Sequence, residues 1–562
     1  MRMALFEDLR ARGIEVTQDA GVLTKFSRDT SIFERKPAVV AYPKNEADIV
    51  TVVKYAADMR GKSFPVYVTP RAAGTDMSGG PLTDSIVLSF TEKMNRVRDI
   101  GKAYVVAEPG IFYRDLEKKT LAASNGLIPS YPASRELCAL GGMIGNNSGG
   151  ELTLRYGKTA DYVESLDVVL SDGSQATFRP LSQSELAQKE AGSGFEAEIY
   201  RKVHDLIIEN RDEIEAARPQ VTKNSAGYAL WDVWNDTTGL FDLTKLVVGA
   251  QGTLAIVTAA RMKLMHLKPH KAMLVIFLND IHDLPEVVHR VMKFQPESFE
   301  SYDDQTFKLA IRFLPQIIGH FGILGMIRLG LSFLPEMWMV LTGGVPKLIL
   351  MAEFAEDDLE MARNKAREAR IAIADVRPRP VRGRRLSNGV QSKLAFRASD
   401  AQKYWIIRRE SFALLRKNLR GFYASPFIDD LVVPVESYPE FIPALNKLLK
   451  EYDLIYTIAG HIGNGNFHII PLMNLSDEKA RKTILELTPR VYDLVSKFHG
   501  STTGEHNDGL IRTPFLNKIF SPKMLELFKE VKNIFDPYCV FNPGKKVGAT
   551  EADIEKFMIK SQ

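Results

Sequence analysis

Near the N-terminus, hydrophobic positions change from short β-rich runs to helical spacing and back again. Apolar residues recur at helical spacing between Ile49 and Ala56, and Asn45, just before them, is a suitable N-cap. Short β-rich runs lie on either side, at Val39–Pro43 and Pro65–Thr69. The pattern therefore predicts a strand, a helix and a second strand.

The second of these strands leads directly into a glycine-rich loop, PRAAGTDMSGG, at Pro70–Gly80. The residues that follow, Ser85–Phe90, form another short β-rich run and not a helix. A nicotinamide-type Rossmann site or a P-loop needs a helix directly after its glycines, because the positive end of the helix dipole holds the phosphate. The sequence thus argues against both of these nucleotide sites.

Two more glycine-bearing loops follow, GGMIGNNSGG at Gly141–Gly150 and a segment within Asp242–Leu264. We expect a strand at Tyr104–Ala107 and a hairpin at Leu166–Phe178 that turns at Asp172-Gly173. Glycines allow backbone N–H groups to approach a large anionic ligand closely, as a pyrophosphate requires. A plain tight turn explains any single loop equally well, but three such loops together favour the ligand.

The hydrophobic pattern changes after about Met273. We expect a strand at Val275–Leu278 and helices at Leu284–Phe294 and Asp357–Ala374. Between these helices lies an unusually apolar insert, Phe307–Met351. The second half of the chain is therefore expected to form a separate unit.

The apolar insert contains Phe313–Ile327, which has no formal charge when His320 is neutral. Prolines and charged residues such as Arg328 interrupt any longer apolar run, so we do not expect the insert to span a bilayer. It is too apolar to lie open to water. Three placements remain open: on a membrane face, on a protein partner or second copy of the chain, or packed internally. The basic stretch Arg377–Arg385, expected as an exposed linker, would suit anionic lipid headgroups.

Composition narrows the function. The chain of 562 residues is 45% hydrophobic and 25% charged, which is typical of a folded protein of two or three domains. A net charge of +4 argues against nucleic acid as the main ligand. The two cysteines, Cys138 and Cys539, cannot build a disulfide framework or an iron–sulfur site, so such a cluster would lie on a partner chain. Met1–Gly13 is charged and lacks the apolar core of a signal peptide, so we expect a cytoplasmic protein.

Six motifs, in order, resemble those of one flavoprotein superfamily. The loop at Pro70–Gly80 resembles the flavin-pyrophosphate loop R-G-x-G-T-x-x-x-G-G of the vanillyl-alcohol-oxidase/PCMH superfamily. Gly141–Lys158 and Gly249–Thr258 resemble its two later flavin-contacting stretches. Three downstream motifs resemble the branch that contains D-lactate dehydrogenases, glycolate oxidase flavin subunits and D-2-hydroxyglutarate dehydrogenases; they are GHIGNGNFH (Gly460–His468), STTGEHNDG (Ser501–Gly509) and FDPYCVFNPGK (Phe535–Lys545).

The resemblance implies an α+β fold. Residues 1–270 would form a PCMH-type FAD-binding domain of two α/β subdomains, and 271–525 an antiparallel-sheet substrate (cap) domain that carries the insert. Residues 526–562 would return to the flavin domain. The FAD is expected to be non-covalent, because the first loop has no His or Cys. Cys138 is expected to be a packed small hydrophobe.

The residues that the resemblance places at the FAD come from all three loops and from the C-terminal motif. They are Arg71, Ala72, Ala73, Gly74, Thr75, Ser78, Gly79, Gly141, Gly142, Gly145, Asn146, Ser148, Gly149, Tyr156, Gly252, Ile256, Asn542 and Lys545.

Four positions depart from the family pattern. Ala72 and Ala73 replace glycines, and a methyl group fits there if φ stays negative. Asn464 replaces the aspartate of G-D-G-N, and Asn507 replaces the glycine of E-H-G. We expect these changes to affect the identity of the substrate more than the chemistry.

Oxidation of a 2-hydroxy acid requires an electrophile, a base, a cation for the carboxylate and a flavin that accepts the hydride. His461 and His468 flank a stretch too rich in glycine for a continuous helix, so we expect a strand end with a bulge or turn that brings both imidazoles together. With Glu505 they would bind a divalent metal such as zinc, manganese or iron. The alternative is a set of satisfied polar residues in a core.

The base and the carboxylate-binding cation follow from the same chemistry. A bound cation would lower the pKa of the substrate hydroxyl, so that a neutral imidazole could accept its proton, and His506 is the candidate. If Glu505 and His506 lay on a strand, one would bind metal and the other would face the substrate. Arg408 matches the branch's W-x-x-R motif and would hold the carboxylate; the alternative is a solvated helix arginine like Arg409.

The expected activity is that of a FAD-dependent dehydrogenase acting on a small, D-lactate-like 2-hydroxy acid. Its electrons would pass to a quinone, an electron-transfer flavoprotein or an iron–sulfur partner. One rival is a transferase of the alkylglycerone-phosphate synthase type, which carries a run of histidines where this chain has Gly504–His506. The other rival is a non-catalytic flavin subunit, which would be expected to lack the His/Glu set. Peripheral contact with the inner face of a membrane and a homodimer are further expectations from the insert.

Overall fold

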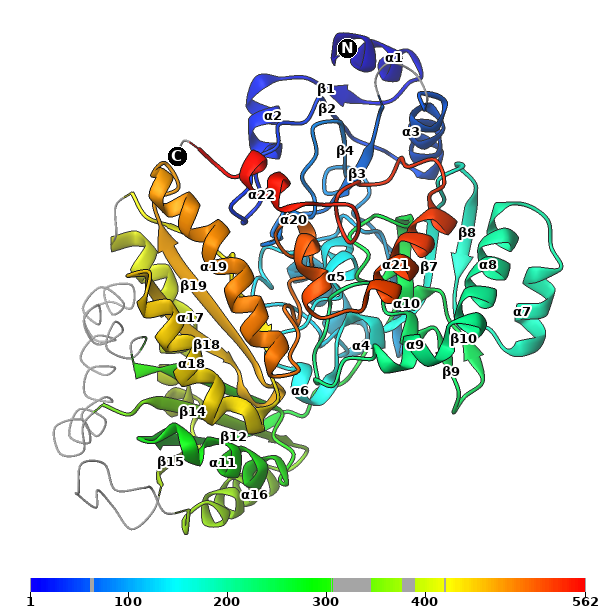
Figure 1. Cartoon of the computed structure of the whole chain (residues 1–562). Coiled ribbons are helices and arrows are strands. Elements are labelled where there is room, and N and C mark those ends of the chain that lie inside the picture. The colour runs from blue at the N-terminus through cyan, green and yellow to red at the C-terminus, as the bar shows by residue number, and fades with distance from the viewer. Residues whose placement is uncertain are drawn as a thin grey trace.

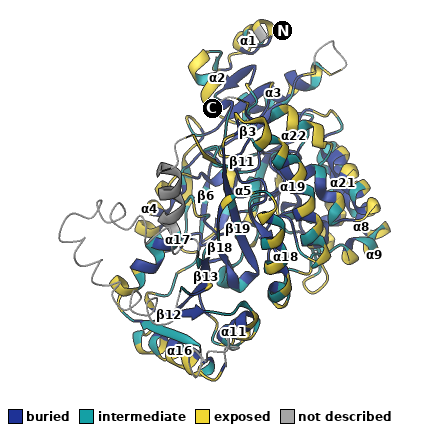
Figure 2. Cartoon of the chain, turned by 60° about the vertical axis from the view of Figure 1, so that its left-hand side comes forward, coloured by how far each residue is buried: buried dark blue, intermediate teal, exposed yellow. Residues whose placement is uncertain are grey.

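The computed structural model describes residues 2–60, 65–304, 306, 345–376, 390–418 and 421–560. Two halves, each built on sheet and helix, meet along a central seam in which α5 (Leu140–Asn146) and α20 (Gly509–Arg512) lie (Figure 1). Strands of the second half are buried and the outer faces of its helices are exposed (Figure 2). Most of the apolar insert and the stretch Arg377–Arg385 lie outside the described residues.

The first sheet has the order β1-β2-β4-β3, and the strands β2, β4 and β3 run parallel to one another. The strands are β1 (Val16–Thr17), β2 (Val39–Ala41), β3 (Val68–Arg71) and β4 (Ile86–Ser89). The predicted helix is α3 (Glu46–Asp58), and the Asn45 side chain caps it by accepting from the amide of Asp48. A strand does follow the first glycine loop, as predicted.

The second sheet is antiparallel, in the order β5-β6-β11-β7-β8. Its strands are β5 (Val97–Ile100), β6 (Tyr104–Ala107), β7 (Val163–Val169), β8 (Gln175–Phe178) and β11 (Ile256–Lys263). The predicted turn at Asp172-Gly173 connects β7 to β8, and Gly173 has a φ of 81°. Helices α8 (Phe195–Glu209) and α21 (Pro522–Phe535) share the core that covers this sheet.

The third sheet is an eight-stranded antiparallel one, in the order β15-β12-β14-β13-β18-β19-β16, with β17 also pairing β19. Alternate residues of β12 (His270–Leu278) face two hydrophobic cores on opposite sides of the sheet. Leu274 packs in the core with the four helices α11, α16, α18 and α19, and Val275 packs in the core with α17; the bounds of these helices follow below. The strands are β12 (His270–Leu278), β13 (Ser298–Asp303), β14 (Leu348–Glu356), β15 (Gln391–Ala395), β16 (Tyr423–Ala424), β17 (Leu431–Val432), β18 (Ile455–His461) and β19 (Asn466–Met473). The helices are α11 (Leu284–Met292), α16 (Leu359–Ala372), α17 (Ala398–Asn418), α18 (Tyr438–Lys450) and α19 (Glu478–Lys497).

The C-terminal segment returns to the first half. The backbone N–H of Val68 donates to the carbonyl of Val540, and Phe541 is buried in the core of the first sheet. The domain boundaries at 270 and 525 stay a prediction. Other described helices and short strands are α1 (Arg2–Ala11), α2 (Ala20–Phe26), α4 (Tyr113–Ser124), α6 (Thr153–Tyr156), α7 (Gln183–Glu190), α9 (Arg211–Ala216), α10 (Thr244–Val247), α22 (Glu551–Phe557), β9 (Trp234–Asn235) and β10 (Leu240–Phe241).

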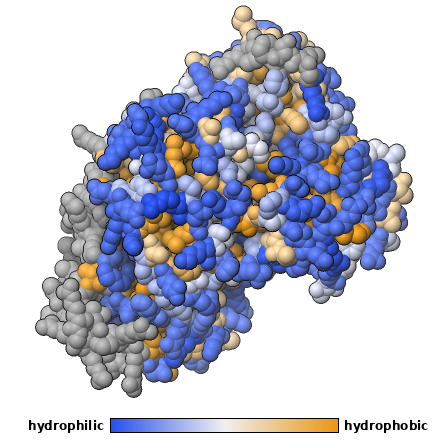
Figure 3. Space-filling view, viewed as in Figure 1, coloured by the Kyte–Doolittle hydropathy of each residue, from blue (hydrophilic) through white to orange (hydrophobic). Residues whose placement is uncertain are grey.

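The arrangement confirms the α+β fold class, with an antiparallel-sheet unit in the second half. On the face seen in Figure 3, hydrophilic side chains cover most of the described surface and hydrophobic ones form small separate groups. Among the described helices, none is both long and apolar enough to cross a bilayer.

Candidate active site

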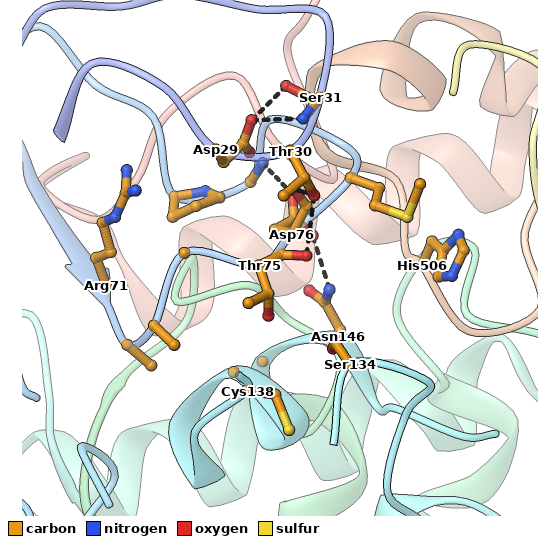
Figure 4. A pocket seen from close by; sticks show the side chains of 18 of the residues that line it. Asp29, Thr30, Ser31, Arg71, Thr75, Asp76, Ser134, Cys138, Asn146 and His506 are labelled. Atoms are coloured by element: carbon orange, nitrogen blue, oxygen red, sulfur yellow. Dashed lines mark hydrogen bonds between the residues drawn. The ribbon is translucent and has the colours of Figure 1, made fainter. Parts of the chain in front are cut away.

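A cavity of about 920 Å³ lies where the two halves meet, at the upper end of the size range of ligand pockets. All three glycine loops line it, and Glu505 and His506 of the second half line it as well. In Figure 4, Arg71 and His506 lie on opposite sides of this cavity, with Thr75 and Asp76 between them. The two halves therefore enclose one elongated site.

The glycines of the second loop leave room that the protein itself does not fill. A Cβ added at Gly142 would meet no described protein atom closer than 3.9 Å, and the same is true of Gly145. Neither glycine has a positive φ, so neither backbone conformation nor protein packing requires glycine there. Both line the cavity, so the bare backbone fits the close approach of a large ligand such as FAD.

In the first loop, Gly74 and Gly79 have φ of 73° and 84°, whereas Ala72 and Ala73 keep negative φ. The condition that allows a methyl group at these two positions is therefore met. Asp76 organises the loop, because its carboxylate accepts from the amides of Ser78 and Gly80 and from Nδ2 of Asn146.

Most of the residues expected to contact FAD line this cavity. They are Arg71, Ala72, Ala73, Gly74, Thr75, Gly141, Gly142, Gly145, Asn146, Ser148, Gly149 and Gly252. The others do not line it; they are Ser78, Gly79, Tyr156, Ile256, Asn542 and Lys545.

Two of the residues that do not line the cavity hold its wall from behind. Nδ2 of Asn542 donates to the carbonyls of Gly80 and Gln251, and Nζ of Lys545 donates to the carbonyl of Leu82 at 2.6 Å. The Tyr156 hydroxyl donates to Glu297 in the second half instead. Cys138 lines the cavity, and burial raises its pKa to about 12, as suits the packed, inert role expected of it.

The two histidines lie on a hairpin, as the glycine-rich stretch predicted. β18 ends at His461, a short 3₁₀ turn follows, and Gly465 has a φ of 69° before β19 begins. A Cβ on Gly465 would come within 2.2 Å of the carbonyl oxygen of Val433, so glycine is required there. The imidazoles of His461 and His468 consequently approach each other, with ring centroids 5.3 Å apart.

Glu505 completes a set of three metal-ligating side chains. Its Oε1 lies 3.2 Å from Nε2 of His461 and 3.4 Å from Nε2 of His468, and the three ligand atoms all lie within 4.8 Å of one another. Two imidazoles and a carboxylate suit a divalent metal, so the donor set fits the predicted ion.

Two carboxylates that sequence reasoning missed orient these imidazoles. Nδ1 of His461 lies 2.6 Å from Oε1 of Glu300, and Nδ1 of His468 lies 3.1 Å from Oδ1 of Asp429. Holding Nδ1–H on a carboxylate leaves Nε2 as the coordinating nitrogen, which is the usual arrangement around metal-bound histidine. Both Nε2 atoms face Glu505.

Glu505 and His506 lie in an irregular loop and not on a strand, so the strand condition considered for their opposite orientations is not met. Instead of a strand partner, the carboxylate of Asp430 holds this loop by accepting from both of their backbone amides, at 2.9 and 2.7 Å. Glu505 joins the metal set, while Nδ1 of His506 lies 2.8 Å from Oδ2 of Asp429. The His506 ring stacks on that of His468, with centroids 5.0 Å apart.

Arg512 is another residue that sequence reasoning missed, and it is fully buried. Its guanidinium donates to the backbone carbonyls of Thr502, Asn507 and Asp429. The segment that carries Asp429 and the loop that carries Glu505 and His506 are therefore tied to one side chain.

Buried charges dominate the electrostatics of this site. Burial opposes ionisation of Glu505, but Lys223 and His461 outweigh it and hold the pKa of Glu505 well below its usual range. Burial alone would lower the pKa of His468, yet Asp429 raises it to about 10. Likewise the carboxylates of Asp430 and Asp429 overcome burial and raise the pKa of His506. A bound cation would act in the opposite direction on the imidazoles.

Arg408 of α17 points inward rather than to solvent. Its Nη2 lies 3.0 Å from Oε2 of Glu300, the carboxylate that also contacts His461. Its Nε is buried and has no hydrogen-bond partner among the described residues. The interpretation as a solvated helix arginine is therefore wrong, although Arg408 does not line the cavity itself.

Lys223 is a further residue that sequence reasoning missed. Its Nζ lies 2.7 Å from Oε2 of Glu505 and 3.4 Å from Oδ1 of Asn466, and the side chain is fully buried. Of the two substituted family positions in this region, Asn464 points to Thr222 and not into the set of metal ligands. Asn507 is buried between the site loop and the flavin-side loops.

The glycine-lined cavity beside a His/Glu set suits a flavoprotein of the oxidase type. A family model described as "FAD binding domain" matches residues 37–179, and one described as "FAD linked oxidases, C-terminal domain" matches residues 267–546. The chain belongs to the FAD-linked oxidases.

Curated relatives are similar over most of the chain. A D-2-hydroxyglutarate dehydrogenase of Pantoea ananatis is 26% identical over 551 residues, which cover 97% of this chain and 51% of the relative. The chain thus spans about half the length of that relative. A D-lactate dehydrogenase of Archaeoglobus fulgidus is 26% identical over 513 residues, which cover 91% of each.

Solved structures share the fold. A 4-ethylphenol oxidase from Gulosibacter chungangensis superimposes with a TM-score of 0.65 at 16% identity, covering 98% of this chain and 97% of its own. An alkyldihydroxyacetonephosphate synthase gives a TM-score of 0.63 at 13% identity, covering 94% and 83%. At such identities the likeness shows the fold alone, and the fold does not separate oxidation from transfer.

Proposed function

We propose that this chain is a FAD-dependent dehydrogenase that oxidises a D-2-hydroxy acid to the 2-keto acid. One observation carries the proposal: Glu505 and His506 line the same cavity as the three glycine loops. Glu505 is also a member of the set with His461 and His468. Metal-ligating and proton-accepting groups would thus lie beside the cofactor loops, as dehydrogenation of an alcohol requires.

The protein would hold FAD by the bare backbone of its glycine loops, and the bound flavin would accept the hydride from C2 of the substrate. His461, His468 and Glu505 would hold a divalent cation, which supplies an electrophile for the hydroxyl and carboxylate oxygens. Glu300 and Asp429 would keep the imidazoles in the coordinating orientation.

Two further side chains complete the chemistry. His506, oriented by Asp429, would take the hydroxyl proton, so the substrate loses one hydride and one proton. Arg408 has a buried Nε without a hydrogen-bond partner among the described residues. This N–H group would donate a hydrogen bond to the substrate carboxylate. The relatives at 26% identity support the class of substrate and not the individual acid.

Anaerobic flavin bleaching tests the proposal. The purified protein should be yellow, acid precipitation should release FAD into the supernatant, and D-2-hydroxy acids should bleach the flavin faster than their L-enantiomers. A transferase of the alkylglycerone-phosphate synthase type would show no net bleaching by any hydroxy acid, and a non-catalytic flavin subunit would show none either. Absence of bleaching across the panel would overturn the proposal.

The electron acceptor is proposed to be a quinone, an electron-transfer flavoprotein or an iron–sulfur partner. The apolar insert supports a peripheral contact with a membrane, where a quinone is available. Co-sedimentation of the full chain with anionic liposomes at low salt, compared with a chain lacking residues 313–346, tests this contact. Recovery of the folded full chain in the supernatant would contradict it.

A further inference from the structure

We propose that Asn507 is a positioning residue that sets the distance between the Glu505–His506 loop and the flavin. The expected effect on flavin reduction rests on the proposed function, whereas the anchoring of the Glu505–His506 loop does not. Asn507 stands at the position of the glycine in the E-H-G pattern that this motif resembles.

The amide of Asn507 joins the two halves. Its Nδ2 donates to the carbonyl of Gly249 at 2.8 Å and to the carbonyl of Asn146 at 3.2 Å. Its Oδ1 accepts from the backbone amide of Asp508 at 2.7 Å. Carbonyls only accept and the amide N–H only donates, so these partners fix which atom is nitrogen. Every hydrogen-bonding group of this fully buried amide is occupied.

Both carbonyls belong to segments that shape the cofactor cavity, the end of α5 and the third glycine loop. Asn146 lines it, and Gly249 precedes Gln251, which also lines it. The two segments are themselves joined, because the amide of Gly249 donates to the carbonyl of Ile144 and that of Gln251 to the carbonyl of Gly145. Asn507 is therefore anchored to a paired, rigid support and not to a single free loop.

The site side of Asn507 is equally constrained. Its backbone amide donates to Oγ1 of Thr503 and its carbonyl accepts from Nη1 of Arg512. Asn507 directly follows His506 and is two residues from Glu505. A shift of the Asn507 backbone relative to the flavin loops would therefore also shift the adjacent His506 and Glu505.

The backbone of Asn507 explains why glycine would be the simpler choice. Its φ of 69° lies in the left-handed region, which glycine adopts without strain and asparagine tolerates better than most residues. Asparagine at this position is more strained than glycine would be, but its side chain makes the two hydrogen bonds to the carbonyls of Gly249 and Asn146. Because the left-handed backbone is retained in glycine and aspartate variants, the side-chain contribution can be tested alone.

Asn507→Gly and Asn507→Asp test the inference in the holoenzyme. The first removes the amide, and the second keeps its shape but presents oxygen to two carbonyl oxygens. Both should retain FAD and metal at wild-type stoichiometry and bind substrate within about two-fold. The limiting rate of flavin reduction should fall by about 10- to 100-fold, the size expected from a misplacement near 1 Å. Asn125→Gly is the matched control, because Asn125 is exposed and has a φ of 55°.

A measurement without substrate separates this inference from the proposed function. Amide hydrogen exchange at Glu505 and His506 should accelerate by at least ten-fold in both Asn507 variants and stay unchanged in Asn125→Gly. If no hydroxy acid bleaches the wild-type flavin, the proposed function fails while the exchange data still decide the anchoring. Wild-type exchange together with wild-type flavin reduction in Asn507→Gly would overturn the inference. A parallel rise in substrate Kd with an unchanged limiting rate would also overturn it.

Discussion

Nζ of Lys223 lies 2.7 Å from Oε2 of Glu505, and the two side chains come from opposite halves of the chain. Both are buried, so the pair is shielded from solvent and salt. The contact occupies one carboxylate oxygen and leaves the other, Oε1, facing His461 and His468. A buried ammonium group thus selects which oxygen of Glu505 is available to a metal ion.

Lys223→Met should destabilise the protein, because it leaves Oε2 of Glu505 buried without its ammonium partner. Breaking a buried pair costs about 3–5 kcal/mol, and urea unfolding would measure the loss. Lys202→Met is the control, since Lys202 pairs with Glu198 on an exposed helix face and should cost less than about 1 kcal/mol. Equal unfolding midpoints for the two variants would show that the Lys223 contact contributes no stability.

Replacing a metal ligand should remove the divalent metal and leave the bound FAD in place. His461→Ala, His468→Ala and Glu505→Ala should each keep FAD, because none of them contributes to the glycine loops. Each should lose the divalent metal in elemental analysis and abolish flavin reduction by substrate. His289→Ala, which removes an exposed imidazole that contacts Glu436, should change neither quantity. Wild-type protein that reduces its flavin at full rate after rigorous metal removal would contradict the metal site.

His506→Ala should spare the metal content and still slow flavin reduction. Removal of a general base costs on the order of 10²–10⁴ in rate. Rapid-mixing kinetics of flavin bleaching give the rate, and elemental analysis of the same sample gives the metal. A variant that loses the metal together with the activity would instead make His506 a ligand, through the alternative set with Asp429 and His468.

The features of the site that the sequence predicted depend only on residues close together along the chain. The glycines between His461 and His468 mark a turn whatever surrounds them, and the bare backbone at Gly142 follows from its residue type. Glu300 could not be found this way. It reaches His461 because Ser301 pairs with Gly460 across β13 and β18, a register that no short-range pattern determines.

Other residues of the site carried a weak signal or none. The paired acids Asp429-Asp430 directly precede the apolar run Leu431–Val433, which marks them as candidates at a strand end. Lys223 has no such marker, because its partner lies in the other half of the chain. Glu505 does not lie on a strand, and Asp430 supplies the hydrogen bonds that a neighbouring strand would have provided.

Asp29, on the wall of the cofactor cavity, should make stability depend on pH. Its Oδ1 accepts from the backbone amide of Ser31, while its Oδ2 is buried without a hydrogen-bond partner among the described residues. Burial, followed by the nearby carboxylate of Asp76, raises the pKa of Asp29 from 3.8 to about 7, although Ser31 and Arg71 oppose the shift. The folded state therefore holds this proton more tightly than the unfolded state does.

The sign follows from proton linkage. The stabilisation from this proton is complete below pH 3.8 and is lost as the pH rises through about 7. Asp29→Asn is neutral at every pH and keeps the acceptor for Ser31, so its free energy of unfolding should gain on that of the wild type between pH 5 and 8. The gain should reach about 1–4 kcal/mol in urea unfolding of the holoenzyme with excess FAD. Asp84→Asn should show no such change between pH 5 and 8, because Arg35 overcomes burial and lowers the pKa of Asp84, so this carboxyl is ionised in both the folded and the unfolded state there. A constant difference between Asp29→Asn and the wild type from pH 5 to 8 would mean that Asp29 does not titrate in this range.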